Sequence, residues 1–197
     1  MQGGRPALVV YDMQVGILSQ LAEGAKVLAA VSRLLDLARG AGVPVFFLRH
    51  MSLPKPLMGQ FQMRQALAWQ RTDDPAEVRP WFLRGSPGFA LADELGMRED
   101  EEAVFDKLGF SAFEGTPLAM ALRDLGCQCF LICGVATEIG IDPTVRHGAD
   151  LGFTPIVVED ACGHGNADCA ARAMENIRHM GDAIITGMHQ VAAALER

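Results

Sequence analysis

The sequence predicts an α/β fold in which helices cover both faces of a parallel β-sheet, forming a three-layer α-β-α sandwich. Short apolar runs alternate with helical patterns along the whole chain, which is typical of parallel strands joined by helices. The runs are too uniformly apolar for strands that have one face in water. With 197 residues, of which 50% are hydrophobic and 21% charged, we expect one folded domain over residues 1–197 and exclude intrinsic disorder.

The first half of the chain is expected to form three strands and one helix. Residues 7–12 and 43–48 are continuous apolar runs that predict buried strands, and residues 103–105 predict a third, shorter strand. Apolar side chains recur at helical spacing over residues 27–38, and the glycines that follow end this helix. Residues 50–98 lack a clear periodicity, so we expect a cap or substrate-binding excursion there.

The second half is expected to form three more strands and four more helices. Thr116 and Pro117 provide an N-cap and a first-turn proline for the first of these helices. Residues 129–133 predict the fourth strand, and residues 142–151 predict a helix that ends at Gly152. Strand, helix, strand and helix then alternate over residues 156–159, 167–180, 183–186 and 189–196.

Charged side chains follow the first three predicted strands at the points where the strands end. Asp12 follows the first strand, Arg49 and His50 the second, and Asp106 and Lys107 the third. Ligands of parallel sheets bind beyond the carboxyl ends of the strands, and a lysine beside a carboxylate tunes its pKa. This pattern predicts an acid/base site. The alternative is that the aspartates cap helices and Lys107 is a solvated charge.

Composition excludes several classes of partner. The formal net charge is −7 and no cluster of Lys and Arg occurs, which argues against nucleic acid and anionic membrane partners. No apolar run approaches the roughly 18 residues of a membrane-spanning helix, and the N-terminus lacks a signal-peptide layout. Five cysteines is an odd number, which favours reduced thiols and a cytoplasmic location.

Three segments in order resemble the isochorismatase-like hydrolases, which belong to the cysteine hydrolase superfamily. Asp12-Met13-Gln14 is similar to the first motif of this family, and Lys107 followed by Ser111-Ala112-Phe113 is similar to the second. Gly134-Val135-Ala136-Thr137, followed later by Glu159-Asp160-Ala161-Cys162, resembles the third. The resemblance implies a Rossmann-like, six-stranded parallel sheet and assembly as a homodimer or homotetramer. It also implies a hydrolase whose substrate is a small, anionic molecule.

The resemblance also implies a catalytic set with one unusual member. Cysteine hydrolases of this family use an Asp-Lys-Cys triad, and Asp12 and Lys107 match its first two members. The position that matches the cysteine is Gly140, which leaves room for substrate or water but provides no nucleophile. Isochorismatases proper also lack the thiol and hydrolyse a vinyl ether, in which a carboxylic acid protonates the terminal methylene carbon and water captures the oxocarbenium ion. Asp12 would be this acid.

Further residues are expected to face the substrate, and no metal or cofactor is expected. The predicted substrate-binding residues are Gln14, Arg49, Phe110, Phe113, Val135, Ala136 and Glu138, with Trp69, Trp81 and Phe82 as further candidates for the pocket wall. The resemblance implies a cis peptide between Val135 and Ala136. Glu138 is interpreted either as a second acid/base group or, preferably, as a charge that caps the helix at residue 142. Nicotinamidases of this family bind a metal through Asp and His after the second strand, but the sequence from Arg49 to Pro54 lacks that spacing.

Two other functions compete with vinyl-ether hydrolysis. The first is hydrolysis of an amide or carbamoyl C–N bond, either by water that Asp12 activates or by another thiol, of which Cys162 lies nearest the rim. The second is a binding or assembly role without catalysis. For all five cysteines, packing in the protein interior is the favoured interpretation.

Overall fold

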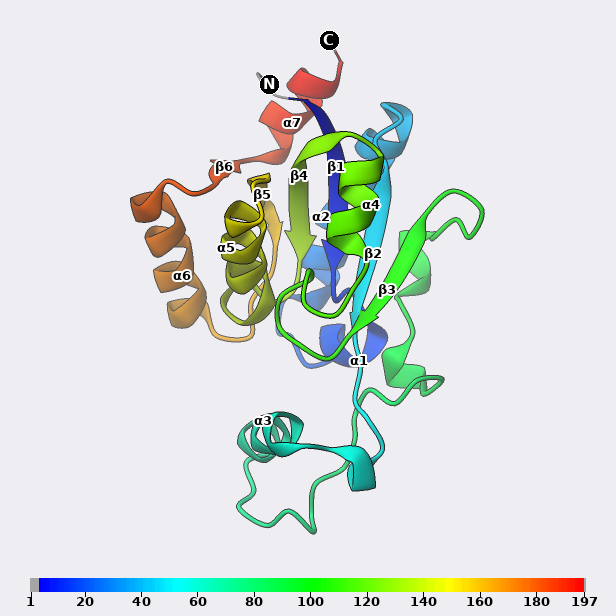
Figure 1. Ribbon diagram of the computed structural model, residues 1–197, viewed down its shortest axis with the longest axis vertical. Helices are drawn as coiled ribbons and strands as arrows, with labels where there is room; N and C mark the ends of the chain where they lie inside the picture. Colours follow the sequence, from blue (N-terminus) through cyan, green and yellow to red (C-terminus); the bar gives the residue numbers. More distant parts are fainter. Residues whose placement is uncertain (1–3, 197) are drawn as a thin grey trace.

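The computed structural model describes residues 4–196 and contains a six-stranded sheet in which every pair of neighbouring strands is parallel (Figure 1). The strand order is β3-β2-β1-β4-β5-β6, so β1 lies in the middle with β2 and β4 as its neighbours. This confirms the predicted fold class. The strands are β1 Arg5–Tyr11, β2 Val45–His50, β3 Ala103–Lys107, β4 Cys127–Gly134, β5 Thr154–Cys162 and β6 Ile184–Thr186.

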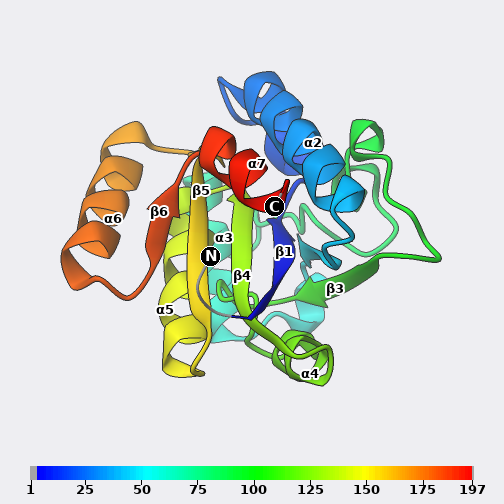
Figure 2. The same cartoon turned by 90° about the horizontal axis from the view of Figure 1, so that it is seen from above.

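Helices cover both faces of the sheet, as Figure 2 shows from above. One hydrophobic layer joins the sheet to α2 (Gly24–Gly40) and α7 (Met188–Leu195). The other layer joins it to α4 (Leu118–Asp124), α5 (Asp142–Asp150) and α6 (Ala167–Met180). The central strands are buried on both sides, which explains their uninterrupted apolar sequences. No helix within residues 4–196 combines the length and the hydrophobicity that crossing a bilayer would require.

The structure adds elements that the periodicity did not predict. A four-residue helix, α1 (Val15–Leu18), follows β1, and α3 (Gln60–Gln70) forms inside the predicted excursion. A π-helical turn, η4 (Thr137–Ile141), links β4 to α5. Three short 3-10 helices occupy the excursion: η1 Lys55–Leu57, η2 Pro87–Phe89 and η3 Asp93–Leu95.

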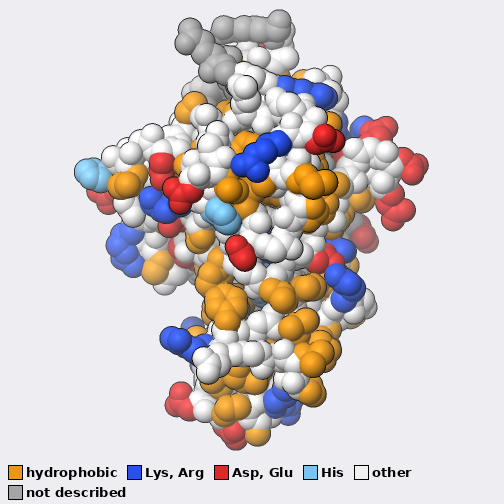
Figure 3. Space-filling view, viewed as in Figure 1, with side chains coloured by type: hydrophobic (Ala, Val, Ile, Leu, Met, Phe, Trp, Pro, Cys, Tyr) orange, Lys and Arg blue, Asp and Glu red, His pale blue; other side chains and the backbone are white. Residues whose placement is uncertain are grey.

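The excursion forms a lobe that projects from the sandwich at the end of β2 (Figure 1). We call residues 51–83 the lobe; it includes η1 and α3. Hydrophobic side chains gather on its surface (Figure 3), and the large exposed ones are Leu57, Phe61, Trp69 and Trp81. The lobe lies beyond the carboxyl ends of the central strands, so it closes one side of the space where a parallel sheet binds ligands.

Gln14 fixes the start of the lobe to the end of β1. Its side-chain amide donates to the carbonyl oxygens of His50 and Phe89, both at 3.0 Å, and its Oε1 accepts from the His50 N–H at 2.7 Å. Gln14 is fully buried, so these bonds satisfy an amide that would otherwise be costly to bury. The loop after β1 and the loop after β2 therefore keep a fixed separation at the sheet edge.

Candidate active site

Asp12 and Lys107 form a buried ion pair at the carboxyl edge of the sheet. Asp12 follows β1, Lys107 is the last residue of β3, and Lys107 reaches across the end of β2 so that its Nζ lies 2.8 Å from Asp12 Oδ2. Only 1% of the Lys107 side chain and 9% of the Asp12 side chain are exposed. The Asp12 backbone has φ +49°, a left-handed conformation that an aspartate tolerates and that directs its side chain out of the strand.

Burial sets the protonation of this pair. Desolvation raises the pKa of Asp12 to about 6, although the charge and the hydrogen bond of Lys107 act in the opposite direction. Burial lowers the pKa of Lys107, and Asp12 partly offsets that effect. Asp12 Oδ1 is buried and has no hydrogen-bond partner within residues 4–196. Asp12 is therefore a carboxyl group with a pKa of about 6 and one buried oxygen that has no hydrogen-bond partner among the described residues.

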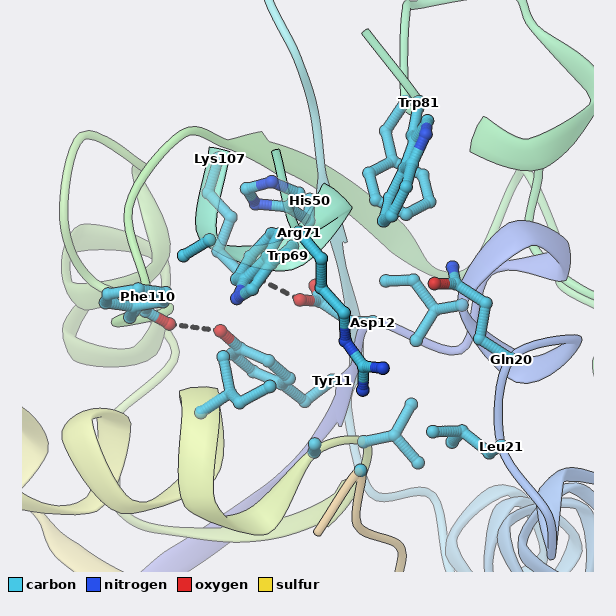
Figure 4. A pocket seen from close by; sticks show the side chains of 17 residues that line it. Tyr11, Asp12, Gln20, Leu21, His50, Trp69, Arg71, Trp81, Lys107 and Phe110 are labelled. Atoms are coloured by element: carbon cyan, nitrogen blue, oxygen red, sulfur yellow. Dashed lines mark hydrogen bonds and ion pairs between the residues drawn. The ribbon is translucent and has the colours of Figure 1, made fainter. Parts of the chain in front are cut away.

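A cavity of about 350 Å³ lies between the sandwich and the lobe, next to Asp12 (Figure 4). The sandwich contributes the polar floor of the cavity, with Asp12 and Lys107, and the peptide between Val135 and Ala136, which is cis as the family resemblance implies. The lobe contributes an apolar wall made of Ala68, Trp69, Trp81 and Phe82. The predicted residues Phe110, Val135, Ala136, Trp69, Trp81 and Phe82 all line this cavity together with Asp12 and Lys107.

Gly140 faces Tyr11 rather than open space. Gly140 is buried in η4, and a Cβ atom at this position would overlap the hydroxyl and the ring of Tyr11. The Tyr11 ring lies beneath Lys107, with Nζ 4.1 Å from the ring centroid, and its hydroxyl donates to the carbonyl oxygen of Phe110. The place that a side chain at 140 would take is therefore occupied by a phenol.

The cysteines lie away from the cavity. None of the five is among the residues that line it. Burial raises the pKa of Cys133 and of Cys162, so both are held as thiols. Cys162 ends β5, where its Sγ donates to the carbonyl oxygen of Val158 at 3.2 Å. These environments are those of packed, unreactive cysteines.

Four predicted substrate-binding residues have other roles in the structure. Gln14 is the buried link described above. Arg49 donates to Asp106 at 2.8 Å and lies 4.3 Å above the Phe89 ring, because strand alternation directs His50, rather than Arg49, toward the cavity. Phe113 packs in the hydrophobic layer below the sheet, stacked on Phe153 at 5.6 Å and edge-on to Phe130 at 5.5 Å.

Glu138 is the fourth of these residues. Its Oε1 accepts hydrogen bonds from the main-chain N–H groups of Gly165 at 2.8 Å and Asn166 at 2.7 Å. Asn166 is the N-cap of α6, so Glu138 holds the loop before α6 rather than capping the helix that begins at Asp142. Because Gly165 lines the cavity, Glu138 shapes the site through this loop.

Sequence reasoning did not identify Arg71 as a site residue. Arg71 follows α3 in the left-handed conformation, with φ +53°, and points into the cavity (Figure 4). Within residues 4–196 its guanidinium makes no ion pair and no hydrogen bond, so it is available to an anionic ligand.

His50 also lines the cavity, and burial, together with the charge of Lys107, lowers its pKa to about 3 and keeps it neutral. In the described part of the chain, no group of three or more His, Cys, Asp and Glu residues is arranged to hold a metal ion.

The chain is similar in sequence and in fold to proteins of one family. The isochorismatase domain matches residues 6–188. The chain is 32% identical over 169 residues to the uncharacterized isochorismatase family protein YecD of Escherichia coli O157:H7, which covers 82% of this chain and 81% of that protein. It is 27% identical over 183 residues to the ureidoacrylate amidohydrolase RutB of Enterobacter sp. (strain 638), which covers 85% and 79%. A cysteine hydrolase from Pseudomonas syringae pv. phaseolicola 1448A has the same fold, with a TM-score of 0.84 and 22% identity over 98% of this chain and 92% of that chain.

Proposed function

The chain belongs to the isochorismatase family and is a hydrolase, and from this premise we propose that it cleaves a small carboxylated vinyl ether by proton transfer from Asp12. The observation that carries the proposal is the state of Asp12. One oxygen is bound to Lys107, the other has no partner among the described residues, and burial raises the pKa of Asp12 to about 6. A carboxylic acid in such a setting is matched to protonating a substrate near neutral pH.

The surroundings of Gly140 support a route without a covalent cysteine intermediate. Residue 140 carries no side chain, and Tyr11 occupies the space beside it. Cys133 and Cys162 are buried thiols with raised pKa values, which disfavours either as an alternative nucleophile. The reaction is therefore best served by acid catalysis with water as the nucleophile.

The proposed reaction uses the ion pair in both of its protonation states. Protonated Asp12 transfers its proton to the terminal methylene carbon of the vinyl ether, and the electron pair of the double bond forms the new C–H bond. The carboxylate that remains stabilises the adjacent oxocarbenium ion, and Lys107 keeps Asp12 acidic enough to release the proton. Water then adds to the cation and returns a proton to Asp12, and the hemiketal separates into a ketone and an alcohol.

The cavity supports a small, flat and anionic substrate. A volume of about 350 Å³ is at the lower end for ligand pockets. Trp69, Trp81 and Phe110 provide aromatic surface on its walls, and Arg71 provides an unpaired positive charge. A carboxylate on the substrate would pair with Arg71 while the vinyl group lies against Asp12.

Hydrolysis of a C–N bond is the second candidate, and it is favoured by one comparison. A relative that is 27% identical over 183 residues is named ureidoacrylate amidohydrolase. In that reaction Asp12 would act as a carboxylate base on water, so the rate would rise with pH through about 6 instead of falling. Assembly as a homodimer or homotetramer and a cytoplasmic location stay predictions from the sequence.

The test is a paired substrate panel in D₂O. One arm contains vinyl ethers such as 2-methoxypropenoate, and the other contains amides and carbamoyl compounds of similar size. Vinyl-ether turnover is expected to place one solvent deuterium in the methyl group of the ketone, and Asp12→Asn is expected to abolish it. Full turnover by Asp12→Asn, or release of ammonia or an amine without any vinyl-ether cleavage, would overturn the proposal.

A further inference from the structure

Tyr11 is a buried polar residue of the cavity that the mechanism above does not use. It is the only tyrosine of the chain, it ends β1 directly before Asp12, and it is 1% exposed to solvent while lining the cavity. Its hydroxyl and ring occupy the space that a side chain at Gly140 would take. The phenol oxygen of Tyr11 therefore lies where the resemblance would place the side chain of a nucleophile.

The hydrogen bonds of Tyr11 leave its oxygen free to accept. A carbonyl oxygen can only accept, so in the bond with Phe110 the phenol uses its one hydrogen as the donor. Burial, and then the charge of Asp12, raises the pKa of Tyr11 well above its usual value, so the group stays a neutral phenol. Its lone pairs accept no hydrogen bond from a side chain or main chain within residues 4–196, and Tyr11 is among the residues that line the cavity.

Asp12 presents a matching acceptor beside it. Asp12 Oδ2 is bound to Lys107, whereas Oδ1 is buried without a partner among the described residues. Tyr11 and Asp12 both line the cavity, and Figure 4 shows the Tyr11 hydroxyl directed toward Phe110 and the Asp12 carboxylate beside Lys107. A water molecule has two hydrogens, and placed between these groups it would donate one to each. Its own lone pairs would then point at the substrate.

We propose that Tyr11 is a catalytic residue that holds the attacking water together with Asp12. This inference rests on the proposed vinyl-ether hydrolysis. Once Asp12 has transferred its proton to carbon, the water donates to the Asp12 carboxylate and to the Tyr11 oxygen. Its oxygen forms the new C–O bond, and the proton that it loses passes to Asp12, which restores the acid.

When a water molecule is held beside the oxocarbenium ion, the ion reacts with this water and goes on to product. Without a water in place, the cation has a second outcome: its new methyl group returns a proton to the Asp12 carboxylate, and the vinyl ether forms again. In D₂O the acid carries deuterium, so every return that removes one of the two original hydrogens leaves deuterium in the methylene group of the substrate. Loss of the Tyr11 oxygen should therefore label substrate that has not been hydrolysed.

The experiment compares the parent protein with Tyr11→Phe in D₂O and reads the recovered 2-methoxypropenoate by NMR and mass spectrometry. Tyr11→Phe keeps the ring beneath Lys107 and removes only the oxygen. We expect kcat to fall about tenfold, the scale of one hydrogen bond, and deuterium to enter the recovered substrate. Ser111→Ala is the matched control, because it removes a neighbouring hydroxyl that bonds His147 and lies outside the cavity; it should label no substrate.

Two outcomes separate this inference from the proposed function. If the parent protein does not cleave the vinyl ether, the proposed function fails and the role of Tyr11 fails with it. If the parent is active and Tyr11→Phe gives unlabelled substrate, whatever its kcat, only the role of Tyr11 is overturned. Should Tyr11→Phe not fold, 3-fluorotyrosine can be introduced throughout the protein and alters only this residue. The weaker acceptor should give measurable label in recovered substrate, and its absence would overturn the inference.

Discussion

Gly140→Cys should destabilise the protein, although it introduces the residue type that the family resemblance implies for this position. The new Cβ would overlap the Tyr11 hydroxyl and ring, so Tyr11 must move. Moving it breaks its hydrogen bond to Phe110, worth about 1 kcal/mol, and its contact with the buried Lys107 ammonium, worth about 2 kcal/mol. With about 1 kcal/mol or more for overpacking, the free energy of unfolding should fall by about 4 kcal/mol.

Urea denaturation followed by far-UV circular dichroism measures this loss. Gly40→Cys is the matched control, since a Cβ at the end of α2 meets no atom within 4 Å, and it should change the stability by less than about 0.5 kcal/mol. In a Tyr11→Val background the ring is gone, so adding Gly140→Cys should then have little effect. The coupling free energy of this double-mutant cycle should be about 4 kcal/mol. A loss below about 1 kcal/mol for Gly140→Cys, or a coupling near zero, would refute the reasoning.

Three further predictions concern the acid, its partner and the substrate anion. The reaction needs protonated Asp12, whose pKa is about 6, so kcat/KM should be level below pH 6 and fall about tenfold per unit above it; a rate that rises with pH contradicts this. Lys107→Met removes the charge that lowers the pKa of Asp12, so the falling limb of the same profile should move to higher pH, and an unmoved limb contradicts the pairing. Arg71→Met should raise KM for a carboxylated substrate roughly tenfold and leave kcat unchanged, because it removes one charge-assisted contact made equally throughout the reaction. The control for that measurement is Arg64→Met, an exposed arginine on α3 that does not line the cavity, and an equal effect of both variants would remove Arg71 from the site.

The sheet was predictable because its signals are local. Each predicted strand is observed, and α6 has the predicted bounds, Ala167–Met180, since an N-cap asparagine and a C-terminal glycine mark them. The predicted fifth strand ended at Glu159, where polar and exposed residues begin, whereas β5 continues through Asp160 to Cys162. Polarity ended the apolar run without ending the hydrogen-bonded strand.

The site was predictable only in part because its residues meet through tertiary contacts. Asp12 and Lys107 each stand at a strand end, and parallel strands bring their ends to one edge. Which side chain of an alternating pair faces the cavity depends on the strand register, which places His50 opposite Lys107 and Arg49 opposite Asp106. Arg71 follows α3, a glutamine-rich helix without an apolar stripe, so nothing in the sequence marked its position.

The residues that absorb and fluoresce in the near ultraviolet, Trp69, Trp81 and Tyr11, are gathered around the cavity. The chain has two tryptophans and one tyrosine, and all three line this one cavity. The intrinsic fluorescence of the protein and nearly all of its absorbance at 280 nm therefore originate from residues that line the cavity. Emission quenching can measure ligand binding without any label. An unfolding curve recorded by fluorescence reports the opening of the lobe, and its comparison with backbone circular dichroism tells whether the lobe separates from the sandwich first.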